Sequence, residues 1–504
     1  MRLHEYLQHD AVGLAALVQS GQVSPQELLA CAQAQAEKTN AQTGAIVRQW
    51  DPAQHAPGDP SAPSLGPFTG VPFLLKDGGQ HFAGLPTSNG CRALVRQNQP
   101  AHAVVVQRWL DAGLVPFGKT NVPELMLKAA TDSQLWGCAS NPWDLTRTPG
   151  GSSGGAAAAV ASGVVPMAGA SDGGGSIRIP ASYCGLFGLR PSRGRISLGP
   201  AAGELWSGAA SEGVLSRSVR DTARALDVVQ GAAPGDPFQI PPPTRRYETS
   251  LVLPPERLRI GFSTASPIGT PVHPEAVAAV RVAVGLLQSL GHEVEEAAPA
   301  VDGQALAVSF LTMYLGHVNA TVRQARQAGA ARSDFEPLTR LLSTLGEATS
   351  SGHFVNELAK WNGYARALGQ FHQRYDLFLT PAVAGPAPLH GAGDLPGWQT
   401  AVMDLLARSG LLVRLARMGL IDGVVQQIAS DNLAFVPFTQ LANLTGTPAM
   451  SVPLHWTADG LPMGAHFIAP HGGEEVLLRL AHQLEIAQPW MHRLPAWVLP
   501  STPA

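Results

Sequence analysis

Apolar runs of strand length alternate with longer stretches of helical apolar spacing along most of this 504-residue chain. The strand-like runs include the segment that ends on Lys76 and residues 114–119, 164–172 and 259–264, and the helical stretches include residues 103–112, 154–162 and 274–290. Strands that alternate with helices are typical of a layered α/β fold. The pattern therefore predicts a mostly parallel or mixed sheet covered by helices.

Short sequence patterns predict where some of these helices and strands begin or end. Ser24 and Pro25 are followed by Glu27, which is a capping box with proline at the first helical position and predicts a helix start. Residues 303–375 and 397–430 have a helical but irregular pattern. Residues 435–470 predict a helix followed by two strands that turn at Asp459–Gly460. No internal repeat is present.

The composition excludes several classes of protein. With 45% hydrophobic and 14% charged residues, the sequence is that of an ordinary globular protein. The formal net charge of −3 and the lack of long basic runs argue against nucleic acid as a partner. The sixteen histidines show no metal-ligand spacing, and the four cysteines are far apart. We therefore expect no metal, no cofactor and a reducing compartment.

The N-terminal segment is too polar for a signal peptide, which favours a cytoplasmic protein. Residues 149–171 are uncharged, yet they are rich in glycine, alanine and serine and contain Pro166. A membrane-spanning helix needs a more hydrophobic average. We therefore expect a tightly packed buried segment here and no membrane span.

Two glycine-rich segments contain serines that are candidates for chemistry. In "GGSSGG" (residues 150–155), Ser152 fits the G-x-S-x-G pattern of a nucleophile elbow, which would need an Asp and a His further along the chain. In "SDGGGSIRIP" (residues 171–180), three glycines lead into Ser176. Residues 113–120, "GLVPFGKT", match the P-loop pattern literally, but the positions between the glycines read as a strand, which argues against nucleotide binding.

Lys76 is the third candidate, because it ends an apolar run and is one of only five lysines. An ammonium group in a dry site loses hydration, which lowers its pKa and makes the neutral amine available as a base. A neutral lysine beside a serine can activate that serine. The alternatives are a surface lysine paired with Asp77, a flexible loop at residues 150–155, and a tight or phosphate-binding turn at residues 171–180.

The residues taken together resemble the amidase signature family. The segment "GGSSGGAAAAVASGVVPMAGASDGGGSIRIPASYCGLFGLRPS" is similar to the signature of that family, and "LLKD", "GKTNVPE", "SNPWD" and "NLTGTPAMSVP" are similar to its other landmarks. The resemblance implies an α/β amidase signature fold, a large mixed β-sheet with helices on both faces. It also implies one amidase domain over residues 1–504, with a catalytic core at 68–200 and a variable helical substrate wall at 303–430.

The family resemblance also assigns roles to individual residues. Ser176 corresponds to the nucleophile, Lys76 to the base, and Ser152 to a relay serine that follows a cis Gly151–Ser152 peptide bond. The oxyanion hole would consist of the backbone N–H groups of Gly173, Gly174, Gly175 and Ser176. Supporting roles would fall to Asp172, Arg178 and Ser153.

The substrate is a small-molecule amide on this interpretation, and large side chains near the motifs are candidates for its pocket. They are Met126, Trp136, Tyr183, Cys184 and Trp206.

The segment "SIRIPASYCGLFGLRPSRGRIS" most resembles bacterial amidases of the 6-aminohexanoate cyclic dimer hydrolase type, which implies a small, largely apolar linear or cyclic amide. A glutaminase subunit of the amidotransferase type that works only in a complex and an elbow esterase with Ser152 as nucleophile remain alternatives. We expect a homodimer.

Overall fold

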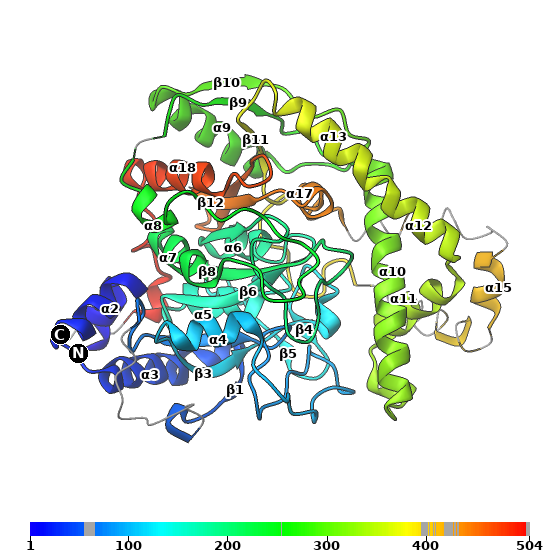
Figure 1. The fold of residues 1–504 in the computed structure, drawn as a ribbon, viewed down its shortest axis with the longest axis horizontal. Helices are drawn as coiled ribbons and strands as arrows, with labels where there is room; N and C mark the ends of the chain where they lie inside the picture. Colours follow the sequence, from blue (N-terminus) through cyan, green and yellow to red (C-terminus); the bar gives the residue numbers. More distant parts are fainter. Residues whose placement is uncertain are drawn as a thin grey trace.

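The computed structural model describes residues 1–54, 66–253, 255–394, 402, 404–406, 408, 410–417, 427, 430 and 433–499. An eight-stranded sheet runs through the centre of this part of the chain (Figure 1). The order of its strands is β10-β9-β11-β13-β12-β7-β8-β6. Strand β9 pairs parallel with β10 and β11, and the other neighbours pair antiparallel.

The strands of this sheet are β6 (Met167–Asp172), β7 (Phe187–Arg190), β8 (Ser211–Ser216), β9 (Arg259–Phe262), β10 (Glu293–Glu296), β11 (Leu377–Pro381), β12 (Ala449–Trp456) and β13 (Pro462–Ile468). A smaller sheet has the order β1-β3-β2, with β1 (Ile46–Gln49), β2 (Pro72–Lys76) and β3 (Val115–Thr120). A two-stranded ladder joins β4 (Asp132–Ser133) and β5 (Gly137–Cys138). The prediction of an α/β fold with a mixed sheet is confirmed.

Helices cover the large sheet on both faces. Helices α5 and α6 contact each other and the strands, whereas α7, α9 and α18 form a separate group against the sheet. The helices are α1 (Leu3–Gln8), α2 (Ala11–Gln19), α3 (Pro25–Thr43), α4 (Val104–Asp111), α5 (Gly154–Ala161), α6 (Arg178–Cys184), α7 (Val219–Val229), α8 (Tyr247–Ser250), α9 (Pro274–Ser289), α10 (Gly303–Gln327), α11 (Pro337–Ala348), α12 (Ser351–Ala359), α13 (Trp361–Phe371), α15 (Leu411–Arg417), α17 (Gln440–Thr445) and α18 (Glu474–Ala487).

Most of the elements expected from the sequence are present. Helix α3 begins at Pro25 with the predicted capping box of Ser24 and Glu27. The predicted turn at Asp459–Gly460 joins β12 to β13, which pair antiparallel. Much of residues 397–430 lies outside the described residues. Helix α6 was not predicted, because its sequence is short and contains Pro180, which a helix tolerates in its first turn.

The site lies where strands of the two sheets end side by side. Strand β2 packs against β6, and these strands end on Lys76 and Asp172. Helices α5 and α6 begin close to the same place, after the two glycine-rich segments. The fold therefore brings together three motifs that are far apart in the sequence.

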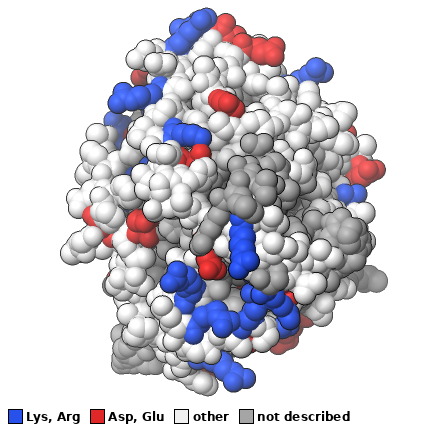
Figure 2. Space-filling model, turned by 90° about the vertical axis from the view of Figure 1, so that its right-hand side faces the viewer, with Lys and Arg blue, Asp and Glu red and all other residues white. Residues whose placement is uncertain are grey.

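Helices α10, α11, α12 and α15 form a layer on the right-hand side of Figure 1, away from the N- and C-termini. Figure 2 views this side, where lysines and arginines gather in the lower part of the surface. Among the described residues, α10 is long and apolar enough by length and composition to cross a membrane. Buried residues make up 56% of its apolar window, and the helix packs against α11, α12 and α17.

Candidate active site

Lys76 lies at the end of β2 with its amine surrounded by serine oxygens. Its Nζ is 2.8 Å from Ser152 Oγ, 2.9 Å from Ser153 Oγ and 2.9 Å from Ser171 Oγ, and it lies 3.3 Å from the carbonyl oxygen of Ser171. A neutral amine offers two N–H donors and one lone pair. Ser153 and Ser171 can accept the two N–H bonds while the Ser152 hydroxyl donates to the lone pair. The geometry suits a base that acts on Ser152.

Burial sets the protonation of this lysine. Lys76 is 0% exposed, and desolvation lowers the pKa of its amine to about 7, although the negative charges of Glu212 and Asp172 raise it. A substantial fraction of the amine therefore carries a free lone pair at neutral pH. The alternative of a surface lysine paired with Asp77 is wrong, because Asp77 lies 3.7 Å from the amine of Lys119.

The Gly151–Ser152 peptide bond is cis, as the family resemblance implies. The serine is 1% exposed, and its Oγ faces Lys76. A nucleophile elbow instead presents its serine at the top of the sheet, open to substrate. The position of Ser152 fits a relay behind the site better than an exposed nucleophile.

A short loop between β6 and α6 carries Ser176, and Asp172 anchors it. The two carboxylate oxygens of Asp172 accept the N–H groups of Gly175 at 2.7 Å and Ile177 at 3.1 Å. The same carboxylate accepts hydrogen bonds from Arg178 Nε at 3.0 Å and Nη2 at 2.9 Å. Burial alone would raise the pKa of Asp172, but Arg178 holds it below its ordinary value. The ion pair thus fixes the loop in a single position.

The backbone N–H groups of this loop differ in whether they have a hydrogen-bond acceptor. The Gly175 N–H is engaged by Asp172, whereas the N–H groups of Gly173, Gly174 and Ser176 have no protein acceptor within the described part of the chain. Free, preorganised N–H groups stabilise an oxygen that becomes negative. One of the four expected oxyanion donors, the Gly175 N–H, is therefore engaged within the protein, and Gly174 and Ser176 line the cavity. Gly175 has a φ of 126°, a conformation that favours glycine.

Replacing Gly174 with alanine is expected to lower kcat about 10- to 100-fold, because the loss of correctly placed backbone donors raises the barrier. A Cβ at position 174 would lie 2.6 Å from the ring of Phe310, so the loop would have to move. Steady-state kinetics on an amide measure the effect. Gly285→Ala is the matched control, because a Cβ there has no neighbour within 4 Å. An unchanged kcat in Gly174→Ala would show that the position of the loop is not critical.

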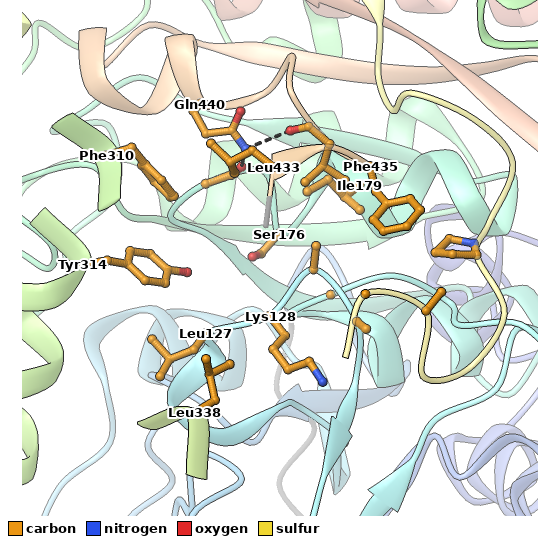
Figure 3. Close-up of a pocket in the computed structure, with 18 of the residues that line it drawn as sticks. Leu127, Lys128, Ser176, Ile179, Phe310, Tyr314, Leu338, Leu433, Phe435 and Gln440 are labelled. Atoms are coloured by element: carbon orange, nitrogen blue, oxygen red, sulfur yellow. Dashed lines mark hydrogen bonds between the residues drawn. The ribbon is translucent and has the colours of Figure 1, made fainter. Parts of the chain in front are cut away.

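Ser176 lines a cavity of about 130 Å³ (Figure 3). Most of the side chains around it are apolar: Leu127, Ile179, Tyr183, Phe310, Leu311, Tyr314, Leu338, Leu342, Leu433, Phe435 and Val436. In Figure 3, Phe310 and Tyr314 lie on one side of Ser176 and Phe435 on the other, while Lys128 extends away from the serine. The Lys128 amine lies 2.5 Å from Asp132 and 2.8 Å from Asp394, so its charge is paired.

The comparisons with known proteins place this geometry in a family. The model of the family described as Amidase matches residues 26–478. The chain belongs to the amidase family. The resemblance to the amidase signature enzymes is confirmed, and the protein is a hydrolase of amide C–N bonds other than peptide bonds.

Two relatives and one solved structure are similar to this amidase over most of its length. It is 36% identical to a 6-aminohexanoate-cyclic-dimer hydrolase of Pseudomonas sp. (strain NK87), over 98% of both chains. It is 33% identical to a lipoamidase of Enterococcus faecalis, over 95% of this chain and 63% of the other. A solved structure of 6-aminohexanoate cyclic dimer hydrolase complexed with substrate matches with a TM-score of 0.87 and 33% identity, covering 98% of this chain and 100% of that one.

The amidase does not use residues 113–120 as a phosphate loop. Residues 115–120 form strand β3, as the sequence indicates, and Lys119 Nζ lies 2.5 Å from Thr87 Oγ1 in the interior. No group of three or more His, Cys, Asp and Glu side chains in the described ranges is arranged to hold a metal ion.

The predicted pocket residues of the amidase fall in different places. Tyr183 lines the cavity, whereas the other four lie outside its lining. Met126 packs against Gly78, and Cys184 is fully buried. Trp206 packs on Gly173 and on Tyr314, behind the loop. Trp136 donates a hydrogen bond to Ser88. Proximity to a motif in sequence was a weak guide to the pocket, because bulky residues beside the motifs mostly support the backbone.

Sequence reasoning missed two groups of residues at the site. Ser171 contacts the lysine amine and adjoins Asp172, so its place in the motif was a usable signal. Phe310 and Tyr314 lie on α10, inside the segment 303–430 that was expected to form the substrate wall, but no local feature of that helix singles out these two side chains.

Proposed function

We propose that this amidase cleaves a small, largely apolar linear or cyclic amide through an acyl-enzyme on Ser176, with Lys76 as base and Ser152 as proton relay. The observation that carries the proposal is the 2.8 Å contact between the buried Lys76 amine and Ser152 Oγ. It is supported by the cavity, because Gly151, which precedes Ser152, and Ser176 line the same space.

Acylation moves one proton along the three residues. Ser152 gives its hydroxyl proton to Lys76 Nζ and takes the hydroxyl proton of Ser176, whose Oγ bonds to the substrate carbonyl carbon. The carbonyl oxygen becomes negative and is stabilised by the N–H groups of Gly173, Gly174 and Ser176. Each such donor contributes about 3 kcal/mol to lowering the barrier.

The same proton then leaves with the amine. An amide nitrogen is a poor leaving group unless it is protonated, and Ser152 can deliver the proton that Lys76 holds. The C–N bond breaks, the amine departs and the acyl group remains on Ser176. Water then attacks the ester by the same relay and releases the carboxylic acid. No metal or cofactor takes part in these steps.

The apolar wall favours an uncharged acyl group. Phe310 and Tyr314 from α10, Leu338 from α11 and Phe435 surround the space beside Ser176. A free carboxylate there would lose hydration without gaining a cation, because Lys128 is already paired. A cyclic amide has no free charge, so we propose a 6-aminohexanoate cyclic dimer type of substrate, with a linear acyl amide as the second choice.

The proposal also covers the domain organisation, the cellular location and the oligomeric state of the enzyme. The chain would act as one amidase domain over residues 1–504, with its catalytic core at 68–200 and its substrate wall in 303–430. The location of Phe310, Tyr314 and Leu338 on the cavity supports the wall assignment. We also propose a cytoplasmic enzyme that forms a homodimer and needs no other subunit.

Activity on a panel of amides tests the proposal. The purified protein alone is expected to hydrolyse 6-aminohexanoate cyclic dimer and hexanamide, with kcat/KM about 100-fold above that for succinamate, because the buried carboxylate of succinamate has no cation. Amine or ammonia release measures the rates. Phe310→Ala is expected to raise KM for the apolar substrates and to leave that for succinamate nearly unchanged. Ammonia release from glutamine only with added subunits would support the amidotransferase alternative instead.

A further inference from the structure

A buried carboxylate on β8, the strand that pairs with β6, has no part in the steps above. Glu212 belongs to β8 and is 4% exposed. In the antiparallel pair of β6 and β8, it stands directly opposite Ser171, whose Oγ lies 2.9 Å from Lys76 Nζ. Ser171 is therefore the neighbour of both groups: it contacts the Lys76 amine and is paired with Glu212 across the sheet.

Gln80 connects this carboxylate to the strand that carries the lysine. Its Oε1 accepts the backbone N–H of Lys76 at 2.7 Å, and its Nε2 donates to Glu212 Oε2 at 2.7 Å. Nε2 also lies 3.2 Å from the carbonyl oxygen of Ala170 on β6. One amide side chain thus fixes Glu212 relative to both β2 and β6.

The other charges near Lys76 are already paired. Asp172 on β6 is bound by Arg178 at 2.9 Å. Lys119 on β3 lies 3.7 Å from Asp77, which follows β2. The cation whose charge acts on Glu212 is Lys76 itself.

The electrostatics of the two groups agree with this geometry. Burial raises the pKa of Glu212 to about 7, against the hydrogen bond from Gln80 and the charge of Lys76. Burial lowers the pKa of Lys76 to about 7, against the negative charge of Glu212. Since the charge of each group shifts the pKa of the other, we expect the protonation of one to depend on the protonation of the other.

We propose that Glu212 is a positioning residue that supplies the counter-charge of Lys76 and so sets the strength of the base. The inference rests on the proposed function of Lys76. When Ser152 passes its proton to Lys76, the amine becomes an ammonium in a dry site, and the nearby carboxylate stabilises that charge. The proton returns through Ser152 to the leaving nitrogen. Glu212 forms and breaks no covalent bond, and the number of protons is unchanged over the cycle.

The test is Glu212→Gln, which keeps an acceptor for Gln80 and removes the charge. Without the anion, the pKa of Lys76 falls, so the acid limb of the kcat/KM profile is expected to move about one pH unit lower. The plateau is expected to fall about tenfold, because the lysine is a weaker base. Glu212→Asp keeps the charge and is expected to keep the acid limb in place. Glu27→Gln, at the exposed start of α3, is the matched control and leaves the profile unchanged.

If the acid limb of the kcat/KM profile stays in place in Glu212→Gln, the proposal is overturned at any height of the plateau. Glu212 would then be a structural residue. A limb that moves to higher pH would overturn it as well.

NMR titration separates this proposal from the failure of the proposed function. The chain has only five lysines, so 13Cε-labelled lysine gives few signals, and Lys76→Met assigns the one of interest. The Lys76 pKa is expected to fall in Glu212→Gln, a result that needs no turnover. In the wild type, Lys76 Cε and Glu212 Cδ are expected to titrate over the same pH range. Independent titrations of the two groups would overturn the proposal even if the variant did not fold.

Discussion

Replacing Ser176 with alanine is expected to lower kcat by about five to six orders of magnitude, because removing the nucleophile removes the acyl-enzyme pathway. The change deletes one hydroxyl group at the wall of the cavity. Substrate binding depends mainly on apolar contacts with Phe310 and Tyr314, so the Kd for a substrate is expected to change less than threefold, or about 0.6 kcal/mol. Single-turnover kinetics and equilibrium binding measure the two effects separately.

The control for Ser176→Ala is Ser289→Ala, at the exposed end of α9, which is expected to behave as the wild type. Activity that survives in Ser176→Ala but is lost when a histidine is replaced would favour an elbow esterase with Ser152 as nucleophile.

Replacing Lys76 with methionine is expected to lower kcat/KM about 10²- to 10⁴-fold, the usual contribution of a general base. Methionine fills similar space without an amine. Lys76→Arg is expected to be equally inactive, because arginine keeps the charge but does not deprotonate in proteins. Lys360→Met, at an exposed lysine, is the control. An active Lys76→Arg would mean that the site needs a positive charge rather than a base.

The wild-type pH profile follows from the same residue. The amine is active when deprotonated and its pKa lies at about 7, so kcat/KM is expected to rise with pH through that value and then reach a plateau. Stopped-flow or initial-rate measurements across this range show the limb. A profile that is flat through neutral pH in the wild type would contradict a role for Lys76 as the titrating base.

The sequence predicted the elements that meet at the site. An apolar run ending in lysine predicted a strand that ends at Lys76, with a lysine in a dry site as one of the alternatives, and residues 164–172 were predicted to form a strand that leads to Ser176. Both expectations match the fold, since β2 ends on Lys76 and β6 leads into the loop of Ser176. These signals are local, so they can be recognised in one sequence without knowing the tertiary contacts.

The surroundings of the lysine could not be predicted in the same way. Ser171 and Glu212 face each other only because β6 and β8 pair in a particular register. Phe310 reaches Gly174 because α10 packs beside the loop, and no pattern in α10 indicates that contact. Register and helix packing depend on the whole core, which is why the base and the segment of the substrate wall were predicted, but the residues of that wall and the carboxylate Glu212 were not.

The location of the acyl group on the enzyme tests the central claim most directly. The protein is mixed with 4-nitrophenyl hexanoate, quenched in acid within one turnover, digested with trypsin and sequenced by tandem mass spectrometry. Cleavage after Arg147 and Arg178 places Ser152, Ser153, Ser171 and Ser176 on one peptide, so fragment ions must separate them. We expect a hexanoyl group on Ser176 in the wild type and none in Ser176→Ala. A hexanoyl group on Ser152 instead would contradict the assignment of nucleophile and relay.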